Sequence, residues 1–84
     1  MKYRRRASEI VEAIQYDGTN FAEIDRFPGV RDWTHYNGQR ISIDINETDG
    51  FVVAIGDWLV MSDGKLRGHT NDDFWRIYEP AKDL

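Results

Sequence analysis

The sequence predicts an α+β domain in which a small antiparallel β-sheet curls on itself, or closes into a partly open barrel, with one short helix packed on it. Short segments rich in β-branched and aromatic residues alternate with tight-turn pairs, which indicates about six to seven strands. Residues 20–27 place their apolar side chains at helical spacing, which indicates the helix. At 84 residues the chain is long enough for one core, so we expect a single domain over residues 1–84.

The first elements expected along the chain are a strand and the helix. Residues 9–16 favour a strand with apolar side chains on both faces. Asn20 and Glu23 form a capping-box pattern at the start of the helix over residues 20–27, and Pro28 stops it. The apolar face of this helix carries Phe21, Ile24 and Phe27.

Two residue pairs in the middle of the chain predict tight hairpins. Asn37-Gly38 accepts positive φ at both central positions of a two-residue turn, and Asp63-Gly64 does the same. A meander of so many short strands tends to curl, which protects its edges. The expected strands around these turns are residues 30–36, 39–45, 51–55, 58–62 and 65–70.

The apolar run from residue 51 to residue 62 is interrupted by Gly56-Asp57, and this break predicts a corner between two consecutive strands. Glycine permits the bend. The Asp57 carboxylate can accept a hydrogen bond from a backbone N–H within the turn. Trp58 would then anchor the next strand in the core.

The C-terminal part is expected to add one helical turn and one strand. Thr70 to Asp73 is a cluster of N-cap residues ahead of an aromatic run, which is typical of a single helical turn. Residues 74–80 are rich in aromatic side chains and favour a last strand, ended by Pro80. We expect Phe74 in the core.

Charge is unevenly distributed along the chain. Lys2, Arg4, Arg5 and Arg6 make residues 1–6 a basic N-terminal segment, whereas the other 78 residues carry a net charge of −8. An acidic body repels nucleic-acid phosphates, so we expect a protein partner, or a homo-oligomer, rather than nucleic acid. Cysteine is absent, which excludes disulfides and thiolate metal sites. Without a secretory signal or an apolar run near the roughly 18 residues of a membrane span, we expect a cytoplasmic location and no membrane association.

No pattern in the sequence assembles a catalytic or metal site. His35 and His69 lack the spacing of a metal-binding pair, and no serine stands beside a matching base. Asp44 to Gly50 resembles a calcium loop only superficially, because its glycine falls at the wrong position, and it is typical of a polar hairpin turn. We therefore expect no catalytic residue, no cofactor and no metal, and we do not expect an enzyme.

The candidate interaction surface consists of cations and large aromatic rings, namely Arg4, Arg5, Arg6, Trp33 and Trp75. Arginine and tryptophan are the residues that most often anchor protein interfaces. The alternative interpretation is also open. Cations at a terminus are commonly solvated, and tryptophans in a small cysteine-free domain commonly belong to the core.

Three stretches of the chain resemble a family of small proteins of tailed bacteriophages and prophages that is named for a PGDYG motif. The opening MKYR…VEAIQYDG is similar to the start of those proteins, IGDWLV to their P-G-D-[YW]-[IL] motif, and DDFWRIYEP to their ending. Ile55 stands where the family has proline, and the middle of the chain does not align. The resemblance implies a phage accessory protein of unknown activity, located in the cytoplasm of a bacterial host, with no catalytic residues. The resemblance also implies that Gly56, Asp57 and Trp58 are a structural signature of the fold.

Two functions remain as expectations. The first is a non-enzymatic protein-binding module that contacts a host or phage protein. The alternative is an oligomer that binds or sequesters a nucleotide or another small molecule, with Arg4, Arg5 or Arg40 on the phosphate. Nucleic-acid binding through the arginine-rich start is a third hypothesis, which the acidic body disfavours.

Overall fold

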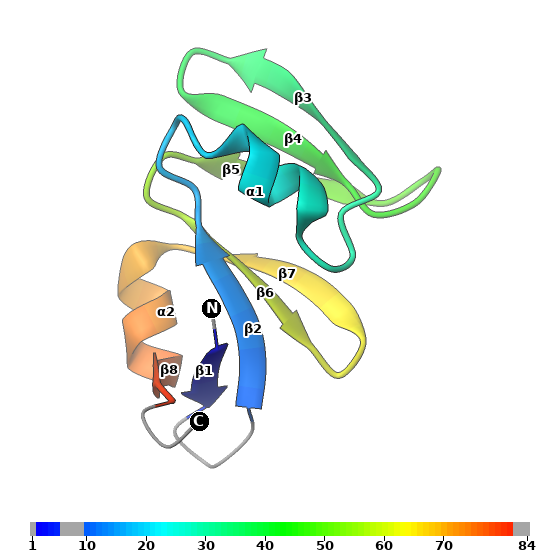
Figure 1. Ribbon diagram of the computed structural model, residues 1–84. Helices are drawn as coiled ribbons and strands as arrows, with labels where there is room; N and C mark the ends of the chain where they lie inside the picture. Colours follow the sequence, from blue (N-terminus) through cyan, green and yellow to red (C-terminus); the bar gives the residue numbers. More distant parts are fainter. Residues whose placement is uncertain (1, 6–9, 82–84) are drawn as a thin grey trace.

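The computed structural model describes residues 2–5 and 10–81, and it confirms the α+β class with antiparallel strands. In this part of the chain, eight strands form two sheets that do not close, and two short helices pack on them (Figure 1). The strands are β1 (Lys2–Arg5), β2 (Ile10–Gln15), β3 (Asp32–Asn37), β4 (Arg40–Asp44), β5 (Gly50–Ala54), β6 (Trp58–Ser62), β7 (Lys65–His69) and β8 (Tyr78–Pro80). The helices are α1 (Phe21–Arg26) and α2 (Asn71–Ile77).

The two sheets differ in size and are joined by two crossings of the chain. The large sheet has the strand order β7-β6-β2-β1-β8, and the small sheet has the order β3-β4-β5. The chain first passes from the large sheet to the small one between β2 and β3, where it forms α1, and it returns between β5 and β6 (Figure 1). The meander expected from the sequence is therefore divided between two sheets.

Each face of the large sheet contributes to a separate apolar cluster. The inter-sheet core lies between the large sheet, α1 and the small sheet, and the α2 core lies under α2 on the opposite face. Strand β6 serves both because successive side chains alternate: Leu59 enters the inter-sheet core, whereas Trp58 and Val60 enter the α2 core. The buried residues of the inter-sheet core are Tyr16, Ile24, Phe27, Ile41, Ile43, Val53, Leu59 and Leu66. Those of the α2 core are Tyr3, Val11, Ala13, Trp58, Val60, Phe74 and Tyr78.

The predicted corner at Gly56-Asp57 is confirmed, and it is the point where the chain leaves the small sheet. Gly56 has a φ of +99°, which favours glycine, and Asp57 Oδ2 accepts a hydrogen bond from the Ala54 N–H at 2.9 Å. The Gly56 N–H donates to the Tyr16 carbonyl at 2.8 Å, and the Tyr16 N–H donates to the Asp57 carbonyl at 2.9 Å. Because Tyr16 directly follows β2, these two bonds hold both crossings between the sheets together.

The basic N-terminal segment is part of the large sheet over residues 2–5. Strand β1 lies between β2 and β8, and Tyr3 is buried against Trp58 and Phe74, with ring centroids 5.2 and 5.0 Å away. The charges of this segment suggested that it would be solvated. Burial of the Tyr3 ring instead holds the segment in a strand. The side chain of Arg5 and the whole of Arg6 lie outside the described residues.

One of the two predicted hairpin turns is confirmed and the other is displaced by one residue. Asp63 and Gly64 both have positive φ, 52° and 73°, as a tight two-residue turn requires. In the other hairpin Asn37 pairs with Arg40, so the turn is formed by Gly38 and the residue after it. The register shifts between residues 35 and 37, which is the position of a β-bulge.

Both helices begin where the sequence predicts, but α2 is longer than expected and α1 lacks its predicted cap contact. The Thr70 hydroxyl accepts a hydrogen bond from the Asp73 N–H at 3.2 Å, and the helix continues to residue 77, so only residues 78–80 of the expected last strand are extended. At α1 the predicted capping box is absent, because the Asn20 side chain instead accepts from the Asp17 N–H at 2.9 Å. Within the described residues no helix is both long and apolar enough to cross a membrane.

Candidate interaction surface

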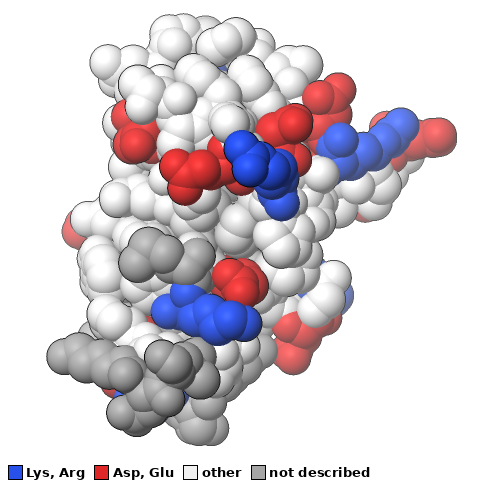
Figure 2. Space-filling model, in the orientation of Figure 1, with Lys and Arg blue, Asp and Glu red and all other residues white. Residues whose placement is uncertain are grey.

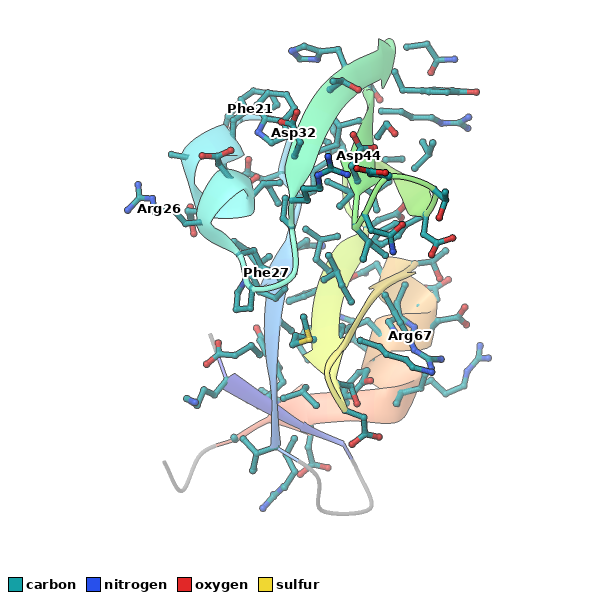
Figure 3. The ribbon with its side chains drawn as sticks, turned by 90° about the vertical axis from the view of Figure 1, so that its right-hand side faces the viewer. Phe21, Arg26, Phe27, Asp32, Asp44 and Arg67 are labelled. Atoms are coloured by element: carbon teal, nitrogen blue, oxygen red, sulfur yellow. The ribbon has the colours of Figure 1, made fainter. Side chains whose placement is uncertain are left out.

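The small sheet is covered on one face and uncovered on the other. Ile41, Ile43 and Val53 point into the inter-sheet core, where α1 lies across them. Figure 3 shows α1 along one side of β3, with Phe21 at its start and Phe27 just past its end. Side chains alternate along each strand, so the residues between these positions point to the other face. This outer face includes Asp32, Thr34, Arg40, Ser42, Asp44, Val52 and Ala54, all exposed or half-buried.

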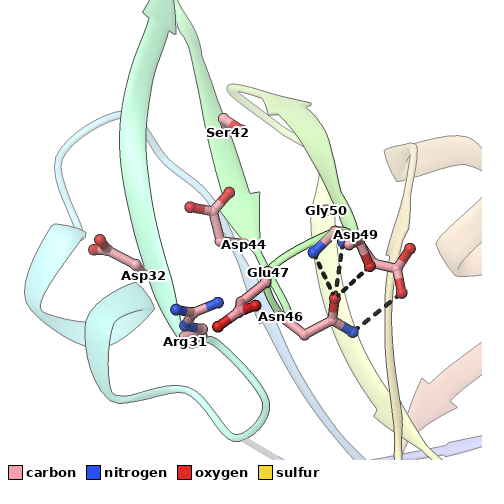
Figure 4. Close-up of a pocket in the computed structure, with 9 residues that line it drawn as sticks. Arg31, Asp32, Ser42, Asp44, Asn46, Glu47, Asp49 and Gly50 are labelled. Carbon is pink, nitrogen blue, oxygen red and sulfur yellow. Dashed lines mark hydrogen bonds between the residues drawn. The ribbon is translucent and has the colours of Figure 1, made fainter.

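An acidic hollow of about 500 Å³ opens where the outer face meets the turn between β4 and β5 (Figure 4). Asp32 and Asp44 are paired across β3 and β4, so they reach the hollow from neighbouring strands. Arg31 is the one cation in its lining. The full lining is Arg31, Asp32, Ser42, Asp44, Asn46, Glu47, Thr48, Asp49 and Gly50. Four carboxylates beside one guanidinium leave the hollow with an excess of negative charge, which favours a cationic ligand group.

The turn that closes one side of the hollow is fixed by the side chain of Asn46. Its Oδ1 accepts hydrogen bonds from the backbone N–H groups of Thr48 and Asp49, both at 2.9 Å (Figure 4). Its Nδ2 donates to Asp49 Oδ2 at 3.1 Å. This is the polar turn expected from the sequence, and the described residues contain no group of three or more side chains arranged to hold a metal ion.

Strand β3 is an edge strand that lies beside β4 alone among the described strands. The other three edges are protected in different ways. Strand β8 has only three residues and ends at Pro80. Strands β5 and β7 lie against each other, so close that a Cβ at Gly68 would be 2.9 Å from the Phe51 ring. Strand β3 therefore offers the longest open edge, with regular pairing from Asp32 to His35 before the bulge. Within this stretch the Trp33 N–H donates to Asp32 Oδ1 at 2.8 Å.

Negative charge is concentrated in the half of the protein that holds the small sheet. Residues 16–57 carry eight aspartates and glutamates against three arginines, whereas the rest of the chain carries seven acidic and eight basic residues. Figure 2 shows several of these acidic side chains across the upper half of the molecule, where α1 and the small sheet lie. The net charge of −8 outside residues 1–6 divides into −5 for residues 16–57 and −3 for the remainder, so the acidic character expected for the body is strongest in this half.

The predicted arginines do not assemble into one surface. Arg4 projects from the large sheet and its Nη2 donates to Glu79 Oε2 at 2.9 Å, while Lys2 Nζ lies 3.0 Å from Glu12 Oε1. The Lys2 ammonium, as hydrogen-bond donor and nearby charge, lowers the pKa of Glu12. Arg40 is on β4 of the small sheet, so the structure does not bring it together with Arg4. A phosphate site built from these cations is not assembled among the described residues.

The predicted tryptophans also lie in different halves. Trp33 is half-buried and stacks on Phe21, with ring centroids 4.9 Å apart and planes 16° apart, so it belongs largely to the packing of α1. Trp75 is on α2, 39% exposed, and contacts Tyr3 edge-on. Trp58, from the structural signature, is buried in the α2 core.

The acidic hollow is the feature that sequence reasoning missed. With Asn37-Gly38 at the centre of the turn, Asp32 would lie opposite Ile43 and the acidic residues of the two strands would face opposite sides. The displaced turn and the bulge together shift the register by one residue, so that Trp33 lies opposite Ile43 and Asp32 lies opposite Asp44. In the shifted register Trp33 lies on the buried face with Ile41 and Ile43, whereas Tyr36 is left 58% exposed.

Comparisons of the chain with protein-family models, with curated proteins and with solved structures find no match.

Proposed function

We propose that this protein is a non-enzymatic protein-binding module whose binding surface is the outer face of the small sheet together with the edge of β3. The observation that carries the proposal is the contrast between this sheet and the rest of the fold. Its outer face is uncovered, and it has the longest open edge of the described strands. Apolar groups are exposed on the small sheet: Val52 on the outer face is 41% exposed, and Tyr36 at the bulge of β3 is 58% exposed. Exposed aromatic and apolar groups bordered by charge are typical of protein-interaction sites.

The cellular setting of the proposal comes from the resemblance to phage proteins. It supports an accessory protein of a phage or prophage that acts in the cytoplasm of the bacterial host and contacts a host or phage protein. The Gly56-Asp57 corner, which belongs to the shared motif, connects the two sheets. Its place in this proposal is to hold the small sheet in position, not to touch the partner.

The acidic hollow weighs against the alternative of a nucleotide-sequestering oligomer. A phosphate needs converging cations or backbone N–H groups. The acidic hollow is instead lined by four carboxylates and one arginine, and this excess of negative charge repels phosphate. The same charge disfavours nucleic acid, so protein binding is the function that the geometry supports best.

Selective capture from a bacterial lysate tests the proposal. Three forms are immobilised: the natural protein, a Tyr36→Ala/Val52→Thr variant of the small sheet, and an Ile10→Thr control on the large sheet, where Ile10 is also exposed. The proposal expects the same proteins on the natural form and on the control, and their loss from the small-sheet variant. Capture that is equal on all three forms, or absent from all three, contradicts it.

A further inference from the structure

We propose that the ligand of this surface is an extended peptide segment rich in lysine or arginine, which adds a strand to the open edge of β3. This inference rests on the proposed function and names the partner. In this arrangement backbone hydrogen bonds to β3 supply affinity, and cationic side chains at alternate positions lie over the outer face and the acidic hollow.

The edge of β3 determines where such a segment can pair. The bulge between residues 35 and 37 interrupts regular geometry near the hairpin turn, so an added strand can follow β3 over Asp32 to His35. That stretch is the end of the strand next to the acidic hollow. Pairing is thus directed toward the carboxylates and away from the hairpin.

The spacing of strands brings lysine or arginine within reach of the carboxylates. An added strand would lie about 4.8 Å from β3 and about 9.6 Å from β4. A side chain on the outer face of the added strand would therefore lie next to Asp32, and its long aliphatic part would extend toward Asp44. The partner side chain two residues along would lie beside Thr34, which is small and exposed.

Charge favours a basic segment over the other chains that could pair with the open edge of β3. A second copy of the chain would bring its own acidic half to the same place, and like charges would meet. An acidic or neutral segment could form the backbone bonds but would gain nothing from the hollow. A basic extended segment satisfies both the edge and the charge.

The first arm of the test uses short synthetic peptides and the full-length protein. A fluorescein-labelled peptide that alternates lysine with threonine is titrated with the protein at low salt, and fluorescence anisotropy gives the Kd. A second peptide has glutamate in place of lysine, and a third keeps the lysines but carries N-methyl groups on alternate backbone amides. Saturable binding of the first peptide alone is expected, because the second lacks the charge and the third cannot pair with a strand.

The second arm compares two protein variants that remove the same charge. Asp32→Asn/Asp44→Asn alters the proposed contact, and Glu23→Gln/Asp25→Asn alters exposed positions on α1. The first variant should raise the Kd of the lysine peptide about fivefold, as expected for the loss of two exposed ion pairs. The second should leave the Kd unchanged, and matching far-ultraviolet spectra would show that all forms are folded.

Several outcomes overturn the inference. One is equal binding of the N-methylated and unmethylated peptides, because backbone pairing is then not involved. Others are an equal effect of the two variants, or a sedimentation experiment in which the protein forms a dimer that Asp32→Asn strengthens. If none of the peptides binds while lysate capture still depends on Tyr36 and Val52, the basic-strand inference fails and the protein-binding function stands. If that dependence is lost as well, both fail.

Discussion

The large and small sheets use the same antiparallel pairing but bury their side chains differently. The large sheet contributes side chains to a core on each face, the α2 core on one and the inter-sheet core on the other. The small sheet contributes to the inter-sheet core alone and leaves its outer face in solvent. The half with the large sheet is nearly balanced in charge, whereas residues 16–57 are acidic. Both halves contribute buried side chains, and the proposed binding surface lies on the sheet that is covered on one face only.

Phe74→Ala should have the largest effect among the changes that test this difference. Phe74 is fully buried in the α2 core and stacks on Trp58 with ring centroids 3.8 Å apart. Truncation of a buried phenylalanine leaves a cavity and costs about 4 kcal/mol of unfolding free energy. Urea denaturation followed by tryptophan fluorescence measures the loss.

The matched control for Phe74→Ala is Val52→Ala on the outer face of the small sheet. Since Val52 is 41% exposed, its truncation should cost about 0.5 kcal/mol or less. If the two truncations were equally costly, the outer face would be buried in solution and the difference between the sheets would be wrong.

Gly56→Val tests the corner that holds the two halves together. A φ of +99° is strained for any side chain, and most of all for a β-branched one, so the change should cost about 2 kcal/mol. No atom lies within 4 Å of a Cβ built at Gly56, so the cost comes from the backbone alone. Thermal unfolding checks the prediction, and an unchanged midpoint would contradict the corner geometry.

Two further substitutions serve as comparisons for Gly56→Val. Gly38→Ala should cost about 1 kcal/mol, because a φ of +47° is close to the left-handed region that other residues tolerate. Asp57→Asn should leave the protein folded, since an amide oxygen can still accept the hydrogen bond from the Ala54 N–H.

Thr70→Ala tests the side-chain N-cap that α2 has and α1 lacks. The Thr70 hydroxyl caps α2, and its loss should cost about 1 kcal/mol of unfolding free energy. Thr70→Ser keeps the hydroxyl and should have almost no effect. Both are measured by urea denaturation, and equal losses for the two variants would show that the cap does not stabilise α2.

Asp17→Asn should have the smallest effect, and that effect should depend on pH. The Thr19 backbone N–H, the Thr19 hydroxyl and the Asn20 N–H donate to the Asp17 carboxylate, and this lowers its pKa below the usual 3.8. A lowered folded-state pKa stabilises the protein above the usual value, and that contribution is lost as pH falls through the folded pKa.

The melting temperature of Asp17→Asn should therefore be below that of the natural protein at pH 7, and the difference should shrink as the pH falls below the usual pKa of 3.8. Asp25→Asn, which removes the same charge from the exposed side of α1, is the control. A difference that persists undiminished at lower pH would contradict the role given to the carboxylate.

Local turn chemistry explains which elements could be predicted from the sequence. Asp63-Gly64 forms the expected tight turn, and Gly56 forms the expected corner, because in both places few residues except glycine fit the backbone. The segment that begins at Phe74 was expected to be a strand from its aromatic residues. It is helical instead, because the Thr70 cap starts the helix early enough to place Phe74 against Trp58.

Long-range packing explains what the sequence alone did not yield. Lys2 to Arg5 form a strand because Tyr3 fits between two distant aromatic rings, which no local pattern indicates. The acidic hollow depends on a displaced turn and a bulge that together shift the β3–β4 register by one residue. That shift is favoured because it aligns Trp33 with Ile43 on the buried face, so the position of the acidic residues follows from core packing.

Amide hydrogen exchange, with and without the alternating lysine–threonine peptide, tests most directly whether the open half of the small sheet is the binding surface. If the open half is the binding surface, the peptide should slow exchange at the backbone amides of β3 between Asp32 and His35. No change is expected at the short edge strand β8 or at β7. Unchanged exchange along β3 under saturating peptide, or protection confined to the large sheet, would contradict the proposed surface.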